Sequence, residues 1–215
     1  MDIDPHSTPV DTPPHLQRLP GQPESLRIDR HLDAHLSAVE ALRSRIHIIE
    51  RIAHRMIACI ENGGCLFWLG NGGSAADSQH LAAELVGRFE QVRPGIRSVA
   101  LTTDTSALTA IGNDEGFDRI FARQIEALGR AGDLMIAIST SGNSPNLLAA
   151  VRSARDLGIE TVGLSGRDGG RLESSTDLCL IVPSDNTARI QEAHILVGHI
   201  LCDLAEQWIL NAYFP

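Results

Sequence analysis

Five short apolar segments, spaced along the chain, constrain the fold more than any other feature. They are CLFWLG (65–70), SVALTT (98–103), DLMIAIS (133–139), TVGLSG (161–166) and LCLIVPS (178–184). Near-continuous apolar runs bounded by turn residues are typical of parallel strands buried on both faces. Helical patterns lie between them, at about 74–88, 117–130, 144–157 and 168–175, and an amphipathic pattern follows at about 187–209. This alternation predicts a doubly wound, three-layer α/β/α sandwich around a five-stranded parallel sheet.

The segment before the first predicted strand has two parts. Residues 1–25 carry six prolines among polar residues and almost nothing apolar, so we expect a disordered arm there. From 26 to 61, apolar residues recur at helical spacing and Asn62-Gly63-Gly64 supplies a stop, which predicts a long helix broken once. The expected organisation is therefore an arm over 1–25 and one domain over 26–215.

Composition excludes several classes of partner. A net charge of -9 argues against a broad nucleic-acid surface, which would need dense Lys and Arg. No apolar run approaches the roughly 20 residues that span a bilayer, and no charged-then-apolar leader opens the chain. The four cysteines form no C-x-x-C pair and no zinc spacing, which favours buried reduced thiols. We expect a cytoplasmic protein without nucleic-acid or membrane partners.

Two loops after predicted strands have the composition of anion sites. Doubly wound sheets bind ligands beyond the carboxyl ends of their strands, where Gly70–Ser74 and Ser139–Ser144 each lead into a predicted helix. Backbone N–H groups, the helix dipole and several hydroxyls can hold a phosphate there. Neither loop fits a nucleotide-binding motif, so the hydroxyl run STSGNS favours a sugar phosphate. Helix capping by Ser and Asn explains either loop equally well.

A third loop region is ambiguous in the same way. Thr102-Thr103-Asp104 follows the second predicted strand, and Ile111-Gly112-Asn113-Asp114-Glu115-Gly116 comes a little later. Their carboxylates and amide can bind sugar hydroxyls, but Asx-turns and helix N-caps use the same residues. Function and capping are about equally good explanations here.

Four polar side chains lie in predicted helices at spacings that suit a metal or an acid–base site. His80 and Glu84 are four residues apart and share a helix face, although such pairs are also common on solvated surfaces. Gln191 and His199 lie in the last helix, about 12 Å apart at 1.5 Å per residue. One metal ion can bind both only from opposite ends, or if two subunits contribute. Between them, His194 reads as a partly exposed side chain.

The segments GNGGSAADSQHLAAEL, VGRFE, AIGNDEGF, AISTSGNS and ARIQEAHILVGHIL together resemble the phosphoheptose isomerases of the sugar-isomerase (SIS) fold. The resemblance runs from about residue 30 to 208 and implies an aldose–ketose isomerase. Such enzymes convert sedoheptulose 7-phosphate to D-glycero-D-manno-heptose 7-phosphate through an enediol or enediolate, the first step of nucleotide-activated heptose biosynthesis. The proline-rich arm, the last eight residues, and Ala188, where many relatives have Asp, depart from the family pattern.

The resemblance also implies roles for individual residues. Substrate contacts fall on Asn71, Gly72, Gly73, Glu84, Asn113, Asp114, Ser139, Thr140, Ser141, Ser144 and Gln191. One Zn²⁺ per subunit is implied at His80, Glu84, Gln191 and His199. Glu84 is the expected base between C1 and C2, and His199 the expected acid or base at the oxygens. The family is a homotetramer with active sites between subunits, which would bring Gln191 and His199 to one ion.

A rival function belongs to another class of protein. Catalytically silent relatives of this fold bind the bacterial replication initiator, and their resemblance includes ARIQE (188–192) and CDL (202–204). Those relatives lack the Glu and the second His. The presence of Glu84 and His199 therefore favours the enzyme, while the pathway that uses the product stays open.

Overall fold

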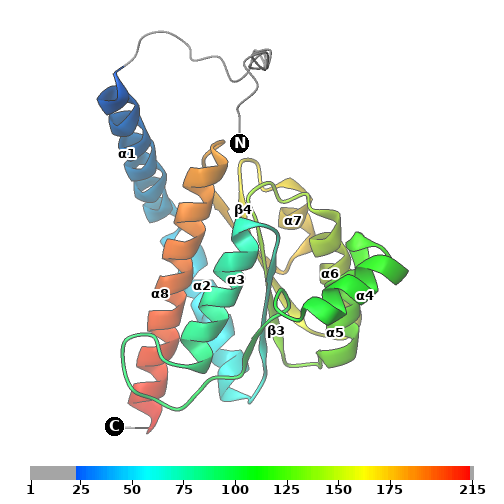
Figure 1. Ribbon diagram of the computed structural model, residues 1–215. Helices are drawn as coiled ribbons and strands as arrows, with labels where there is room; N and C mark the ends of the chain where they lie inside the picture. The colour runs from blue at the N-terminus through cyan, green and yellow to red at the C-terminus, as the bar shows by residue number, and fades with distance from the viewer. Residues whose placement is uncertain (1–22, 214–215) are drawn as a thin grey trace, which may run out of the picture. The chain divides into compact units, whose positions relative to one another are not determined.

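The computed structural model describes residues 23–213, and its centre is one sheet of five parallel strands (Figure 1). The strands are Leu66–Gly70 (β1), Ser98–Ala100 (β2), Leu134–Ser139 (β3), Glu160–Gly166 (β4) and Leu178–Val182 (β5). Their order in the sheet is β2-β1-β3-β4-β5, with every neighbouring pair parallel. Because the chain leaves β1 toward β2 and then returns to the other side at β3, the switch point lies between β1 and β3. Sheets of this kind bind ligands beyond the strand ends at that point.

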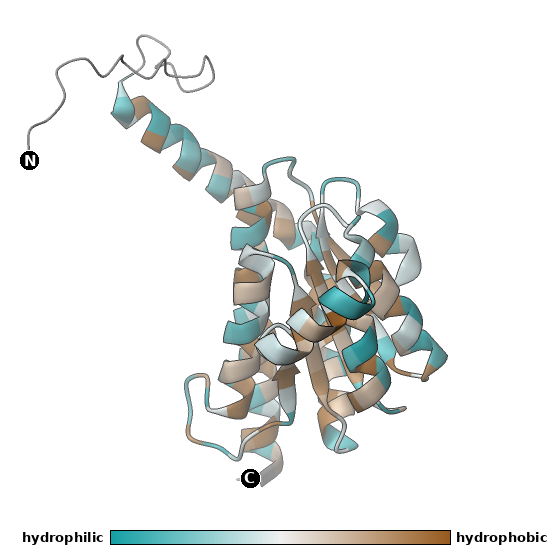
Figure 2. Cartoon of the chain, turned by 45° about the vertical axis from the view of Figure 1, so that its right-hand side comes forward, coloured by the Kyte–Doolittle hydropathy of each residue, from teal (hydrophilic) through white to brown (hydrophobic). Residues whose placement is uncertain are grey.

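Helices cover both faces of the sheet, as the sequence predicts. One layer holds α2 (Ile46–Glu61), α3 (Gly73–Val86) and α8 (Thr187–Tyr213). The other holds α4 (Thr105–Asp114), α5 (Ala122–Leu128), α6 (Pro145–Asp156) and α7 (Gly170–Ser175). Alternate residues of β1 enter the two cores, since Trp68 packs in the first and Phe67 in the second. Figure 2 shows the resulting hydrophobic sheet between two helical layers with many hydrophilic positions.

The chain divides into two compact units, residues 1–33 and 34–215. The described part of the first unit, residues 23–33, forms the first turns of α1 (Glu24–Ala41). A 3-10 turn, η2 (Leu42–Arg45), separates α1 from α2, so the predicted long helix is broken once. Most of the predicted arm, residues 1–22, lies outside the described residues, and helix is already present at Glu24.

The structure differs from the predicted elements around β2. This strand has three residues, because the chain turns away after Ala100 and Asp104 caps α4 by accepting the Ala107 N–H at 2.9 Å. The helix α4 is not among the predicted helices, since its polar ends resemble loops. The helix predicted at 117–130 is a 3-10 turn, η3 (Phe117–Arg119), followed by α5, and the last helix continues to Tyr213.

The cysteines and the lengths of the helices can be compared with the sequence within the described residues. All four cysteines are free thiols, three of them buried. Between residues 23 and 213, no helix combines the length and the apolar character that crossing a membrane requires.

Candidate active site

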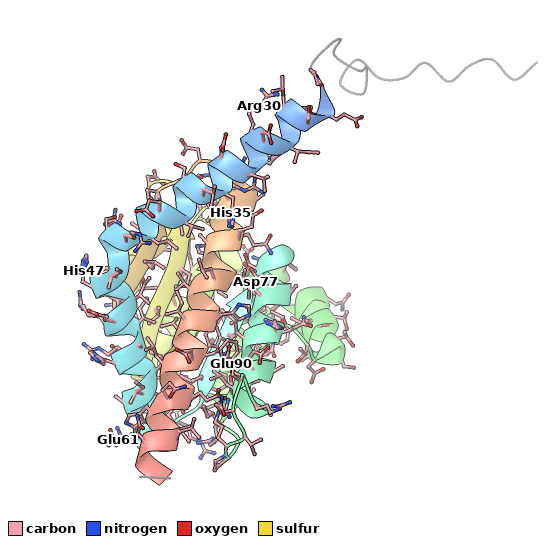
Figure 3. The ribbon with its side chains drawn as sticks, turned by 90° about the vertical axis from the view of Figure 1, so that its left-hand side faces the viewer. Arg30, His35, His47, Glu61, Asp77 and Glu90 are labelled. Carbon is pink, nitrogen blue, oxygen red and sulfur yellow. The ribbon has the colours of Figure 1, made fainter. Side chains whose placement is uncertain are left out.

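The site is built on two helices of one layer, α3 and α8, which pack closely against each other (Figure 3). Gly198 makes the approach close, because a Cβ at this position would lie 2.5 Å from Leu81 Cδ1. His80 precedes Leu81 and His199 follows Gly198, so the same contact brings the two imidazoles together. The helix packing thus determines which polar side chains meet.

His80, Glu84 and His199 converge on one point. His80 Nε2 lies 2.9 Å from His199 Nε2 and 3.3 Å from Glu84 Oε1. The two imidazole rings meet edge to face, with centroids 5.1 Å apart. The His80 side chain is 48% exposed and that of Glu84 is 21% exposed, so solvent and a small ligand can reach the cluster. The predicted shared face of His80 and Glu84 is therefore directed at His199.

The donor set of this cluster fits a divalent metal ion. One atom from each of the three side chains lies within 4.8 Å of the others. A tetrahedral Zn²⁺ with bonds of about 2.0–2.1 Å places neighbouring ligand atoms roughly 3.4 Å apart. The separations of 2.9 and 3.3 Å are close to that value. Two imidazoles and one carboxylate also form a common catalytic zinc set, which leaves a position for substrate.

Gln191 reaches the same helix through a different contact. Its Nε2 donates to Asp77 Oδ1 at 3.2 Å, and a Cβ at Gly73 would lie 2.6 Å from that nitrogen. Asp77 is three residues before His80, so Gln191 packs against α3 within one turn of the cluster. Gln191 and His199 therefore both contact α3, at different turns of that helix, and their binding to one metal ion stays a prediction.

Asp77 is a buried carboxyl group that sequence reasoning missed. Burial raises the pKa of Asp77, while the hydrogen bond from Gln191 and the nearby charge of His80 lower it, and the net direction is upward. The sequence does contain a signal for Asp77. It lies three residues before His80 and seven before Glu84, so the three side chains share one face of α3.

The loop from β3 to α6 presents hydroxyls at a helix N-terminus. Ser139 Oγ accepts the Gly142 N–H at 3.1 Å and lies 3.4 Å from Ser144 Oγ. Ser144 is the N-cap residue of α6, but its side chain makes no capping hydrogen bond. Thr140 and Ser141 are half-buried between them. Capping therefore does not use up the hydroxyls, and the loop can accept a phosphate.

A reciprocal amide pair ties this loop to the loop after β1. Asn71 Nδ2 donates to Asn146 Oδ1 at 2.9 Å, and Asn146 Nδ2 donates to Asn71 Oδ1 at 2.8 Å. Asn146 is buried and its Oδ1 also accepts the Leu147 N–H. The sequence singled out Asn71, Gly72 and Gly73 but not Asn146. The pair fixes the two candidate phosphate loops relative to each other.

Asn113 and Asp114 lie in the other helical layer. They end α4, are exposed, and contact each other through Asn113 Nδ2 and Asp114 Oδ1 at 2.7 Å. This helix packs against the core of α5 and α6, whereas the cluster lies on α3 and α8. Their contact with substrate stays a prediction.

The loop between α3 and β2 is held by an ion pair that the sequence did not indicate. The side chains of Arg93 and Glu206 are fully buried and joined at 3.2 Å. Arg93 also donates to the carbonyls of Glu84 at 2.7 Å and Leu85 at 2.8 Å, which closes the end of α3. Burial opposes ionisation of Glu206, but three backbone N–H groups and Arg93 outweigh it and lower its pKa.

His194 is buried, unlike the partly exposed side chain that we expected. Its Nε2 lies 2.9 Å from the carbonyl of Ser165, to which the neutral ring donates. Burial lowers the pKa of His194 to about 4, and the hydrogen bond to Ser165 opposes that shift only in part. This histidine is part of the core of α8.

The chain is similar to known proteins along most of its length. A family model described as SIS domain matches residues 31–166. A protein named phosphoheptose isomerase from Helicobacter pylori (strain P12) is 51% identical over 181 residues, 84% of this chain and 94% of the relative. Another with that name, from Roseiflexus sp. (strain RS-1), is 54% identical over 170 residues, 79% of this chain and 86% of the relative.

Solved structures agree with these similarities. The phosphoheptose isomerase from Neisseria gonorrhoeae matches with a TM-score of 0.81 and 45% identity, over 86% of this chain and 100% of that one. The phosphoheptose isomerase from Francisella tularensis matches with a TM-score of 0.84 and 39% identity, over the same shares of the two chains.

Proposed function

Since this chain belongs to the phosphoheptose isomerases of the SIS-domain family, we propose that it converts sedoheptulose 7-phosphate to D-glycero-D-manno-heptose 7-phosphate. The observation that carries the proposal is the convergence of His80, Glu84 and His199 in the layer that also holds the loop after β1. The rival function, binding of a replication initiator without catalysis, is not favoured. Relatives that are about half identical and nearly fully covered carry the enzyme's name.

The substrate's phosphate is assigned to the two tied loops. Ser139, Thr140, Ser141 and Ser144 offer hydroxyls at the start of α6, where the helix dipole favours an anion. Asn71, Gly72 and Gly73 offer backbone groups at the start of α3. The carbon atoms that react then extend toward His80, Glu84 and His199.

The chemistry moves two protons and needs no oxidant. Glu84 takes the carbon-bound proton from C1 of the ketose and returns a proton to C2, which passes through an enediolate. The proton on the C1 oxygen must leave and the C2 oxygen must gain one, and we assign this transfer to His199. Glu84 has two carboxylate oxygens, so one can face His80 while the other accepts the proton.

A zinc ion is proposed at the convergence point. His80, Glu84 and His199 would hold it, with Gln191 as a further oxygen ligand beside Asp77. When bound, the ion polarises carbonyl and hydroxyl oxygens of the substrate and favours negative charge on them. Removal of zinc with a chelator is expected to lower turnover, and stoichiometric Zn²⁺ to restore it.

A homotetramer in the cytoplasm is also proposed. Large apolar side chains are exposed on the helical surface of the second unit: Leu36 at 63%, Ile46 at 50%, Ile200 at 37% and Leu204 at 36%. Exposed apolar side chains of this size are typical of subunit contacts when they gather on one surface, and Ile46 and Ile200 line one shallow pocket. Sedimentation equilibrium should give four chains per particle; a monomer at micromolar concentration would contradict the assembly.

The function is tested by incubating the purified protein with sedoheptulose 7-phosphate and following the sugar carbons by ¹³C NMR. We expect the anomeric C2 signals of the ketose to decline while the anomeric C1 signals of the aldose appear. Fructose 6-phosphate is the control for the length of the sugar, and no conversion is expected with it. Absence of aldose with or without Zn²⁺ contradicts the proposal, and capture of a replication initiator would then favour the rival.

A further inference from the structure

We propose that Phe89 is a positioning residue for His199, and that the buried Arg93–Glu206 pair in turn holds Phe89. This inference rests on the proposed function of His199 and goes beyond the site residues described so far. Phe89 lies in the loop between α3 and β2, next to the labelled Glu90 in Figure 3, where the loop runs beside α8.

Phe89 and His80 contact His199 in different ways. The rings of Phe89 and His199 are stacked, with centroids 5.6 Å apart and planes at 27°. The ring of His80 meets His199 edge to face at 78°. An imidazole on a helix can turn about two side-chain bonds, and a flat partner together with an edge partner restricts both. The stack therefore fixes the plane in which His199 Nε2 is directed at His80.

The backbone of Phe89 is itself fixed from α8. Its N–H donates to Glu206 Oε1 at 3.0 Å, and the next two N–H groups donate to Glu206 Oε2 at 2.9 and 2.8 Å. Glu206 lies seven residues after His199, which is two turns along the same helix. Glu206, which binds the loop, and His199, on which Phe89 stacks, thus lie on the same helix, α8.

The Arg93–Glu206 pair also contacts the backbone of Glu84. Arg93, paired with Glu206, donates to the Glu84 carbonyl at 2.7 Å. One buried ion pair therefore fixes the backbone behind the proposed base and the ring behind the proposed acid.

The test compares the wild-type protein with Phe89→Leu, Phe89→Tyr and Val92→Ala. Leucine keeps apolar contact with the core but has no flat face, and tyrosine keeps the ring. Val92 is 80% exposed in the same loop and serves as a matched control. Two readouts are taken: the His199 ring C–H resonances in ¹³C-histidine-labelled apoprotein, assigned with His199→Gln, and the kcat and KM for sedoheptulose 7-phosphate.

We expect Phe89→Leu to remove the ring-current shift of the His199 protons and to lower kcat about three- to tenfold at little changed KM, the fold-change that corresponds to losing one aromatic pair. Phe89→Tyr should keep the His199 resonances and kcat close to those of the wild-type protein, and Val92→Ala should change neither the resonances nor kcat. Unmoved His199 resonances in Phe89→Leu would overturn the inference, as would moved resonances with unchanged kcat. The resonances need no turnover, so an inactive wild-type protein contradicts the proposed function while the NMR comparison still decides the stack.

Discussion

Replacing Glu206 with glutamine should destabilise the protein far more than the loss of an ordinary surface charge. In Glu206, Oε1 accepts from Phe89 N–H and Arg93 Nε, and Oε2 accepts from Glu90 N–H and Gln91 N–H. Glutamine must place its NH₂ group at one of these two positions. Two N–H donors of the loop or of Arg93 then face the NH₂ group, which cannot accept from them. Arg93 also stays buried without a negative partner.

The size of the effect follows from the burial of the pair. Both side chains are 0% exposed, so water cannot replace the lost partner. Removing one member of a buried ion pair costs about 3–5 kcal/mol. The Arg43–Glu40 pair is the matched control, because its side chains are 73% and 71% exposed. Glu40→Gln should leave the free energy of unfolding almost unchanged, because water screens this exposed pair.

Urea denaturation followed by circular dichroism, at several protein concentrations, measures both variants. The pKa of Glu206 is lowered in the folded state, so its contribution is present above the unfolded pKa of about 4.3 and is lost as pH falls through the folded pKa. The difference in the free energy of unfolding between the wild-type protein and Glu206→Gln should therefore be smallest at low pH. A loss below about 1 kcal/mol at pH 7 would refute the account of this pair.

The remaining predictions concern a core histidine and the tied loops. Because burial lowers the pKa of His194 to about 4, the unfolded chain gains a proton there between about pH 6.5 and 4 that the folded chain does not. The free energy of unfolding should fall by up to about 3 kcal/mol as the pH decreases through that window, and His194→Gln should flatten the slope of the urea midpoint against pH. Asn146→Ala should leave the Asn71 amide unpaired and cost about 2 kcal/mol of stability, with a KM about tenfold higher in the isomerase assay. An unchanged slope or an unchanged KM would contradict the respective reasoning.

The sheet and most helices follow from the sequence because their signals are local. Each strand is a continuous apolar run, and each run appears in the sheet. The helix α4 was not predicted, because its capping residue Asp104 and its last residues, Asn113 and Asp114, are residue types that are also common in loops. A helix is predicted reliably from the sequence only when its start and stop residues differ from those of a loop.

The site was predictable only in part, because some of its contacts depend on how two helices pack. His80 and Glu84 are four residues apart, which is a local spacing, but their meeting with His199 depends on the bare Cα of Gly198 against Leu81. Glu206 has no sequence signal of its own, since an acidic residue on an amphipathic helix is usually solvated. Long-range contacts of this kind are visible only in three dimensions.

The proposed mechanism requires that Glu84 carries the proton between C1 and C2 of a heptose phosphate, in a site that includes His80 and His199. It is tested most directly by measuring turnover and binding of sedoheptulose 7-phosphate side by side for the wild-type protein and Glu84→Gln. The wild-type protein should convert the sugar, whereas Glu84→Gln should bind it with a similar Kd and turn it over at least about a hundredfold more slowly. A Glu84→Gln variant with full activity would contradict the claim.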